Sequence, residues 1–244
     1  MKSLRRHQQD WEALGRVDPL WAVLTSKSRR HGRWDPAEFF ATGVRDVAAL
    51  MAAAQSVGLP ERREKALDFG CGVGRLTRAL ATHFGECVGV DISAPMLAQA
   101  AELNRDCERC RFVLNTADDL RTFESGSFDL VYSRYVLQHL PGRAMVRSYL
   151  AEFMRVLRPG GLLVFQLPNR IGLLHRLQPR RRLYGLLRWL GLDERMLLER
   201  LELTPMRMGF MTEEAVTRVM VDLGGKVVRV ERASAVEHTY FVTR

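Results

Sequence analysis

The feature that most constrains the fold of this chain is a glycine-rich turn between two apolar segments. Residues 67–77 read Leu-Asp-Phe-Gly-Cys-Gly-Val-Gly-Arg-Leu-Thr, and a second apolar run ends in Asp91, seventeen residues after the last of these glycines. This order predicts a strand, a turn that opens a helix, and a second strand that ends in a carboxylate. Gly70, Gly72 and Gly74 let the backbone turn tightly and let a ligand approach without meeting a Cβ atom. The pattern is typical of a parallel α/β sheet that holds the ribose of an adenosine cofactor, with Asp91 accepting hydrogen bonds from the ribose hydroxyls.

The spacing of the glycines indicates which adenosine cofactor is bound. A dinucleotide turn of the form G-x-G-x-x-G would place its third glycine at Arg75 or at Thr77, and neither is glycine. The glycines instead alternate and follow an acidic residue, Asp68. A carboxylate there repels a pyrophosphate and suits a ligand with an ammonium group. S-adenosylmethionine carries an amine and a sulfonium and has no phosphate, so it is the cofactor we expect.

Four motifs in order resemble those of the class I S-adenosylmethionine-dependent methyltransferases. They are the glycine turn with Asp91, the segment 115–120 (Asn-Thr-Ala-Asp-Asp-Leu), the segment 127–133 (Ser-Phe-Asp-Leu-Val-Tyr-Ser) and the segment 157–161 (Leu-Arg-Pro-Gly-Gly). The resemblance covers roughly residues 64–168. It implies that Asp68, Gly70, Gly72 and Gly74 hold the methionine end of the cofactor. It also implies that Asp91 binds the ribose, Ile92 one adenine face and Asp118 the adenine amine, and that Arg134 touches the cofactor.

Alternating helical and strand patterns predict the rest of the architecture, with strands at 65–69, 87–91, 111–115, 128–133, 161–167, 226–232 and 239–243 and with helices that include 75–83 and 141–157. We expect an α/β fold, a seven-stranded, mostly parallel, doubly wound sheet with an N-terminal helical leader and a helical insert after the fifth strand. The predicted segments are a leader at 1–60, a cofactor-binding core at 61–168, an arginine-rich lid or insert at 169–211, and a C-terminal helix with an antiparallel strand pair at 212–244. Asp35 is expected to cap a helix beginning at Pro36, Ser93 one beginning at Pro95, and Thr212 one in the last segment.

Charge and cysteine content limit the partners. The chain has 37 Lys and Arg residues against 28 Asp and Glu residues, a net charge of +9, which favours an anionic partner or substrate. The four cysteines have no second closely spaced pair, so no metal site is predicted, and reduced thiols in a cytoplasmic protein are expected. Neither an export signal nor a membrane-spanning run is recognised.

The segment 169–211 is the most distinctive part of the chain. No Asp or Glu occurs between Phe153 and Leu192, whereas six arginines lie at 170, 176, 180, 181, 182 and 188, opposite a leucine stripe that breaks at Pro179. The interpretation ranked first is a lid whose arginines attract an anionic substrate. The second is a solvated basic face, and the third is attachment to an anionic membrane surface through a basic amphipathic helix.

A proton acceptor is sought just past the fourth strand. His139, in the run Tyr135-Val-Leu-Gln-His-Leu-Pro141, lies where an imidazole can act as a general base, although a purely structural histidine is the higher-ranked alternative. His238 beside Glu237 is a weaker candidate. Transfer to a good nucleophile needs no base when the reactants are aligned.

Missing motifs narrow the substrate. After the fourth strand the chain lacks the Asn/Asp-Pro-Pro-aromatic motif of base-amine methylation, the paired glutamates of arginine methylation and the carboxylates of metal-assisted catechol methylation. The leading hypothesis is therefore methylation of an O or N atom of a small molecule that is anionic or carrier-linked, as in the tailoring of a secondary metabolite or sugar. The alternatives are an RNA methyltransferase that uses the basic segment, and a non-catalytic S-adenosylmethionine-binding protein. The sequence does not determine an oligomeric state.

Overall fold

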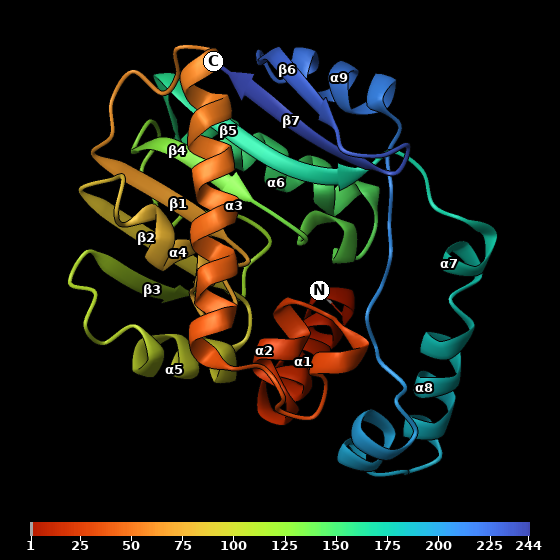
Figure 1. Cartoon of the computed structure of the whole chain (residues 1–244). Coiled ribbons are helices and arrows are strands. Elements are labelled where there is room, and N and C mark those ends of the chain that lie inside the picture. The colour runs from red at the N-terminus through yellow and green to blue at the C-terminus, as the bar shows by residue number, and fades with distance from the viewer. Residues whose placement is uncertain (1) are drawn as a thin grey trace.

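The computed structural model describes residues 2–244 and contains one seven-stranded sheet (Figure 1). The strands are β1 (Lys65–Phe69), β2 (Glu86–Asp91), β3 (Cys110–Leu114), β4 (Phe128–Ser133), β5 (Leu157–Pro168), β6 (Lys226–Arg232) and β7 (Glu237–Thr243). The helices are α1 (Lys2–Val17), α2 (Pro19–Val23), α3 (Pro36–Ser56), α4 (Arg75–Leu80), α5 (Ala94–Leu103), α6 (Arg143–Val156), α7 (Leu173–Leu177), α8 (Pro179–Trp189) and α9 (Glu213–Asp222). Single turns lie at η1 (Lys27–Arg29), η2 (Leu137–His139) and η3 (Met196–Arg200).

The strand order is β3-β2-β1-β4-β5-β7-β6. Strands β1 to β5 pair in parallel, and β7 pairs antiparallel with both β5 and β6. The chain moves outward from β1 to β3 and then returns to β4, so the winding reverses between β1 and β4. In open parallel sheets a ligand binds at the carboxyl ends of the strands that flank such a switch point.

The central strands are apolar at consecutive positions because both faces of the sheet are covered. On β1, Leu67 and Phe69 pack on the face covered by α6 and α9, whereas Ala66 packs on the opposite face, with α3 and α4. Strand β5 divides in the same way, with Leu163 and Phe165 on one face and Leu162 on the other. This two-sided burial makes the sheet doubly wound, as the sequence predicted.

A third apolar cluster joins the leader to the insert across the carboxyl edge of the sheet. Ala13, Leu14 and Trp21 from α1 and α2 pack with Tyr184 of α8 and with Leu197 of η3. Segments about 170 residues apart in sequence therefore meet beneath the ends of β1 and β2, and Figure 1 shows α1 and α2 below the sheet with α7 and α8 beside them. The leader and the insert together enclose the switch point.

Most predicted element boundaries are confirmed within a few residues. Asp35 caps α3, its Oδ1 accepting from the Glu38 N–H at 2.9 Å, and Ser93 and Thr212 cap α5 and α9. The helix expected to reach His83 ends at Leu80, and the helix expected at 141–157 spans Arg143–Val156. The fifth strand begins four residues before the predicted position, because Leu157 already pairs with Phe128 of β4. The division into four segments stays a prediction.

Candidate functional site

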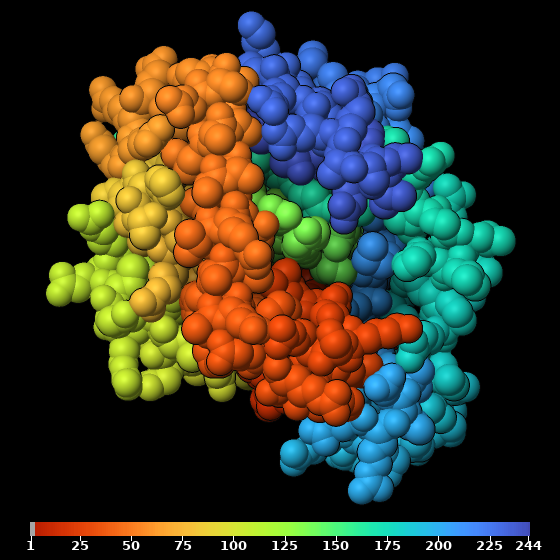
Figure 2. All heavy atoms as spheres, in the orientation of Figure 1, coloured from red at the N-terminus to blue at the C-terminus, as the bar shows by residue number. Residues whose placement is uncertain are grey.

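A cavity of about 1020 Å³ lies at the carboxyl edge of the sheet, at the switch point. Residues of α1 and α2, the ends of β1 and β2, the segment that follows β4, and the insert line it. Figure 2 shows the hollow in the space-filling view, between α3, the leader, the C-terminal strands and the insert. Because it runs without interruption from the glycine turn to the insert, one cavity can hold a cofactor and an acceptor together.

The glycine turn and Asp91 form one end of this cavity. Gly70 and Gly72 line it, and both have positive φ, +77° and +54°. A Cβ atom on Gly70 would lie 2.3 Å from Cγ2 of Val136, so only glycine fits there. The Asp91 carboxylate accepts hydrogen bonds from the N–H groups of Gly72 and Ser93, each at 2.9 Å. Burial raises the pKa of Asp91, and these backbone hydrogen bonds oppose the rise.

Of the other residues assigned to the cofactor, only Ile92 and Arg134 line the cavity. Asp68 lies beneath the turn, where its carboxylate accepts from the Thr77 hydroxyl at 2.7 Å and burial raises its pKa to about 6. Gly74 begins α4 with φ +83°, and a Cβ there would lie 2.7 Å from Nδ2 of Asn104. Asp118 is exposed, away from the cavity, and the nearby polar group that lines the cavity is Asn115. The cofactor roles of all eight assigned residues stay predictions.

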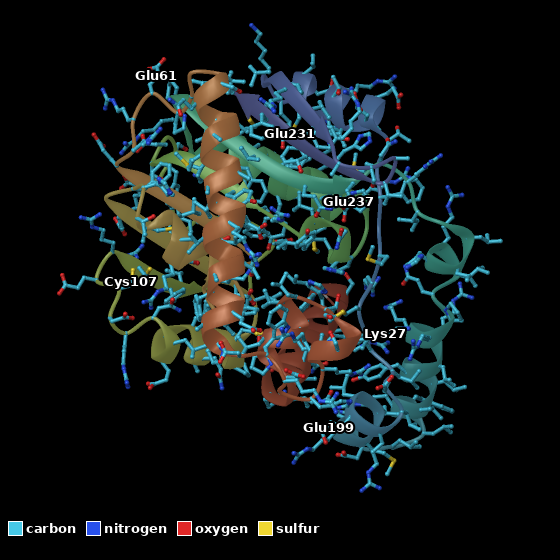
Figure 3. All side chains as sticks on the ribbon, in the orientation of Figure 1. Lys27, Glu61, Cys107, Glu199, Glu231 and Glu237 are labelled. Atoms are coloured by element: carbon cyan, nitrogen blue, oxygen red, sulfur yellow. The ribbon has the colours of Figure 1, made fainter. Side chains whose placement is uncertain are left out.

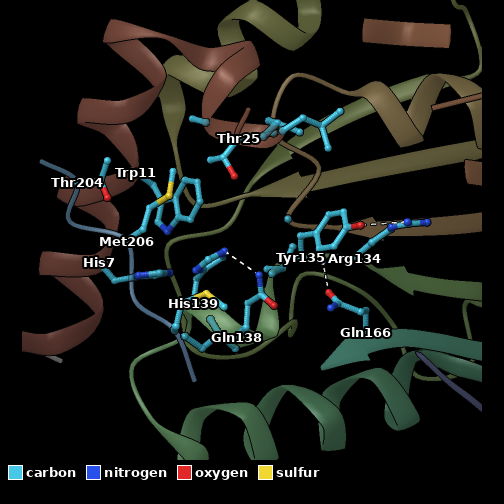
Figure 4. A pocket seen from close by; sticks show the side chains of 18 of the residues that line it. His7, Trp11, Thr25, Arg134, Tyr135, Gln138, His139, Gln166, Thr204 and Met206 are labelled. Atoms are coloured by element: carbon cyan, nitrogen blue, oxygen red, sulfur yellow. Dashed lines mark hydrogen bonds between the residues drawn. The ribbon is translucent and has the colours of Figure 1, made fainter. Parts of the chain in front are cut away.

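An ion-pair network that the sequence does not predict lies at this end of the cavity. Asp46 of α3 lies 2.6 Å from the Arg75 guanidinium and 3.2 Å from that of Arg134. Arg134 also donates to the Tyr135 hydroxyl at 3.1 Å, and the Tyr135 N–H donates to Gln166 Oε1 at 3.1 Å (Figure 4). Tyr135 has φ +61°, an unfavourable conformation for a tyrosine, which this network holds in place. No local motif marks Asp46, because its partners come from distant parts of the chain.

His139 lies in the middle of the cavity wall. Its Nδ1 lies 2.5 Å from the Arg207 carbonyl oxygen, which can only accept, so Nδ1 carries the proton. Nε2 is then unprotonated and can accept a hydrogen bond, and the Gln138 side-chain amide donates to it at 3.2 Å, as Figure 4 shows. Burial lowers the pKa of His139 to about 4, so the imidazole is neutral near pH 7.

A second histidine and a tryptophan accompany His139. The Trp11 ring meets the His139 ring edge-on, with centroids 5.4 Å apart, and His7 lies next to Trp11 on α1. Burial, followed by the neighbouring His139 and the arginines Arg207 and Arg181, lowers the pKa of His7 to about 3. His238, the weaker candidate base, does not line the cavity, and its Nδ1 lies 3.1 Å from the Glu213 carboxylate. The structure therefore brings only one of the two candidate bases to the cavity.

The insert contributes two positively charged side chains to the cavity, Arg180 and Arg181, and His175 lines it as well. Arg180 donates to the Glu202 carbonyl and Arg181 to the Pro205 carbonyl, each at 3.2 Å. Within residues 2–244 neither guanidinium forms an ion pair with a carboxylate. Burial, together with the Arg207 charge, lowers the pKa of Arg181, and the nearby Asp10 carboxylate opposes the fall. Glu237, labelled in Figure 3, lines the cavity at the start of β7.

The donor set at the Asp91 end fits S-adenosylmethionine. The Asp91 carboxylate receives only backbone N–H donors from the described residues, which leaves lone pairs for two hydroxyl groups and repels a phosphate. The glycine cradle admits a ligand that any Cβ atom would obstruct, and Ile92 and Met96 offer apolar surface to a base. Among the described residues no cluster of His, Cys, Asp and Glu could hold a metal ion. Fold and site thus define a class of α/β protein that binds a phosphate-free adenosine cofactor.

Comparison with known proteins agrees with this class. The family model described as "Methyltransferase domain" matches residues 67–165. Over 159 residues the chain is 30% identical to tocopherol O-methyltransferase, chloroplastic, of Arabidopsis thaliana, covering 59% of this chain and 44% of that protein. Over 148 residues it is 36% identical to trans-aconitate 2-methyltransferase of Deinococcus radiodurans, covering 59% and 53%. The chain thus matches about half the length of these relatives.

Solved structures share the fold over the whole chain. Magnesium protoporphyrin IX methyltransferase (ChlM) from Synechocystis PCC 6803 with bound SAH superposes with a TM-score of 0.63 at 18% identity, covering 99% of each chain. The DhpI-SAM-HEP complex gives a TM-score of 0.61 at 16% identity, covering 100% of this chain and 99% of that chain. Residues 67–165 thus match a methyltransferase domain, and the whole chain shares the fold of these solved structures.

Proposed function

We propose that this chain transfers a methyl group from S-adenosylmethionine to an O or N atom of a small molecule that carries an anionic group. The observation that carries the proposal is one cavity that is lined by the Asp91 carboxylate, by the neutral His139, and by Arg180 and Arg181, whose guanidinium groups donate to backbone carbonyls. The names of the relatives, an O-methyltransferase of tocopherol and a 2-methyltransferase of trans-aconitate, support a small-molecule acceptor.

The chain's own residues would bind and orient the cofactor and the acceptor and would deprotonate the acceptor. The bound cofactor supplies a methyl group already activated on a sulfonium, so alignment and exclusion of water are the main tasks left to the protein. Asp91 and the glycine turn fix the ribose end, and the Trp11 ring shields the middle of the cavity. The Asp46 carboxylate pairs with both Arg134 and Arg75 and offsets one of their two positive charges, which reduces the repulsion of a cationic cofactor at that end of the site.

His139 is the proposed general base. The Arg207 carbonyl holds the proton on Nδ1, so Nε2 can take the proton of an acceptor hydroxyl or amine once the Gln138 amide turns aside. The lowered pKa, about 4, keeps the ring neutral and makes it a weak base. Such a weak base can deprotonate an acceptor whose hydroxyl or amine proton becomes acidic as the oxygen or nitrogen forms its bond to the methyl carbon.

Arg180 and Arg181 would bind the anionic group of the acceptor. Each already donates to a backbone carbonyl, which fixes the guanidinium and leaves other N–H groups free for a carboxylate or phosphate. The same charge is the basis of the RNA alternative. The arginine-rich helix α8 exposes leucines rather than a row of stacking aromatics, which favours a small anionic acceptor over RNA.

The direct test measures S-adenosylhomocysteine formation by mass spectrometry. Purified protein would be incubated with S-adenosylmethionine and pairs of hydroxyl- or amine-bearing acceptors, each acid matched with its neutral amide. Turnover of acids in preference to amides is expected, and addition of RNA should give none. Tight S-adenosylhomocysteine binding with no turnover of any acceptor would instead favour a non-catalytic binding protein.

A further inference from the structure

The outer face of the insert exposes an unusual amount of apolar surface. Leu173 and Leu174 of α7 are 71% and 72% exposed, and Trp189 of α8 is 79% exposed. Four more leucines of the same segment are exposed, at positions 177, 183, 186 and 190. These seven side chains are between 45% and 79% exposed, so the described chain covers them only in part, and Leu174 also lines the cavity. We call the exposed side chains of residues 173–190 the insert face.

The fold of α8 does not depend on the insert face. Its inner side is fixed by Tyr184, which is buried against Leu197 and whose hydroxyl donates to Glu194 at 3.4 Å. Leu187 packs on the same cluster. Leu186 and Leu190, one turn apart, project on the other side and remain exposed. Helix α8 therefore has two apolar sides, one that packs in the core and one that is exposed to solvent.

Arginines surround this exposed stripe. Arg176, Arg182 and Arg188 are exposed and lie between these leucines in the sequence, which has no Asp or Glu from Phe153 to Leu192; Arg188 reaches toward the Tyr184 side of α8. Arg188 has one partner, Glu194, at 3.5 Å, and Arg176 lies 4.9 Å from the Phe210 ring centroid. Apolar side chains ringed by cations on an exposed helix fit the boundary between lipid headgroups and acyl chains.

We propose that the insert face binds an anionic membrane surface, with the leucines and Trp189 entering the interface and the arginines contacting lipid phosphates. In the part of the chain that the structure describes, no helix is long and apolar enough to cross a membrane, so α7 and α8 lie along the surface. A second copy of this chain is a poorer occupant, because a two-fold contact would set the arginines of both copies against one another. The phosphates of a nucleic acid would pair with the arginines but would leave the leucines exposed to water.

The same segment reaches the cavity. Leu174, Gln178 and Pro179 line the cavity wall, and Gln178 donates to the Met208 carbonyl at 2.9 Å. A membrane held against the insert face would therefore lie beside the cavity entrance. This step rests on the proposed methyltransferase function: an amphiphilic acceptor with an anionic head would enter from the lipid surface, past the insert. Membrane binding itself does not require that function.

The test is co-sedimentation of the full chain with vesicles. We expect binding to vesicles of phosphatidylcholine mixed with phosphatidylglycerol, little binding to phosphatidylcholine alone, and weakening by salt, which screens the arginines. The triple variant Leu186→Ser, Trp189→Ser, Leu190→Ser should bind about tenfold less or weaker still, because each serine removes apolar surface from the interface. Arg182→Gln with Arg188→Gln should remove the preference for the anionic lipid.

Matched controls use exposed residues elsewhere on the surface. Val44→Ser, Leu114→Ser and Val221→Ser replace side chains that are 60%, 48% and 64% exposed, and should leave vesicle binding unchanged. Affinity for S-adenosylhomocysteine, measured by calorimetry on every variant, reports whether the fold and cofactor site are intact. It also separates failure of this proposal from failure of the proposed function.

Three results would overturn the proposal. One is equal binding of the wild-type protein to neutral and anionic vesicles, or no binding to either. Another is an equal loss of binding in the control variant. The third is a wild-type dimer by light scattering that the Leu186, Trp189 and Leu190 substitutions convert to a monomer, which would make the insert face an interface between copies of the chain.

Discussion

Replacing Asp91 with alanine tests the assignment of the cofactor site most directly. In the structure its carboxylate accepts from the Gly72 and Ser93 N–H groups, each at 2.9 Å, at the end of β2. Two ribose hydroxyls would add hydrogen bonds to a charged acceptor, which are among the stronger ones in proteins. Leaving those hydroxyls unpaired in a largely buried site should cost about 1–3 kcal/mol of binding free energy. The dissociation constant of S-adenosylhomocysteine should therefore rise about 5- to 150-fold.

Isothermal titration calorimetry of the wild-type and Asp91→Ala proteins measures this change. The substitution also leaves the Gly72 and Ser93 N–H groups without their acceptor, so the melting temperature of the unliganded variant must be measured separately. Glu86→Gln is the matched control: it removes a carboxylate at the start of the same strand, where Glu86 lies 3.0 Å from Lys65, outside the cavity. A folded Asp91→Ala protein with wild-type affinity would show that the ribose lies elsewhere and would refute the site.

The other predictions concern the base, the charged end and the turn. His139→Ala should slow turnover roughly 10²-fold. Because burial lowers the pKa of His139 to about 4, wild-type activity should persist well below pH 6.5 and fall only as the pH approaches 4. A pH–rate profile whose acid limb lies near 6.5 would contradict a neutral, buried imidazole. Arg180→Gln with Arg181→Gln should raise KM for an anionic acceptor and spare cofactor affinity by calorimetry; an unchanged KM would leave both as surface charge. Gly74→Ala should destabilise the protein by about 1–3 kcal/mol in urea unfolding, more than Gly191→Ala, because both have positive φ but only the Cβ at 74 would meet neighbouring atoms within 4 Å. Equal losses would attribute the effect to backbone strain alone.

The sequence predicts those parts of the fold whose causes are local. Strands β1, β4 and β6 occur at the predicted residues, because short apolar runs bounded by turn residues carry their own signal. Helix α3 begins at the predicted Pro36 because an Asp cap followed by Pro fixes a helix start. The sequence predicts the less regular segments less well. Helix α4 ends three residues before the predicted His83, and residues expected in the turn before β5 already pair with β4. Pairing with a neighbouring strand, rather than local propensity, determines the structure of that turn.

The sequence predicts less of the site, because several of its contacts join distant segments. Asp46 and Arg134 are 88 positions apart, and nothing near either residue indicates the other. The proton position on His139 depends on the Arg207 carbonyl, which the insert brings to within 2.5 Å. Asp118 was assigned by the order of motifs alone, and the structure places it at the surface. Its neighbour Asn115 carries the recognisable signal, a polar side chain directly after a strand at the carboxyl edge of the sheet.

The distribution of charge along the cavity favours a cationic methyl donor and an anionic acceptor over other pairs. Protonated histidines beside the sulfonium would repel it, but burial keeps His139 and His7 neutral, with pKa values of about 4 and about 3. The middle of the cavity is therefore uncharged and lined by aromatic and sulfur-containing side chains such as Trp11 and Met206. When a neutral hydroxyl or amine attacks a sulfonium, the positive charge spreads from the sulfur toward the nucleophile in the transition state. Uncharged side chains around His139 favour that dispersal, because apolar surroundings disfavour concentrated charge more than dispersed charge.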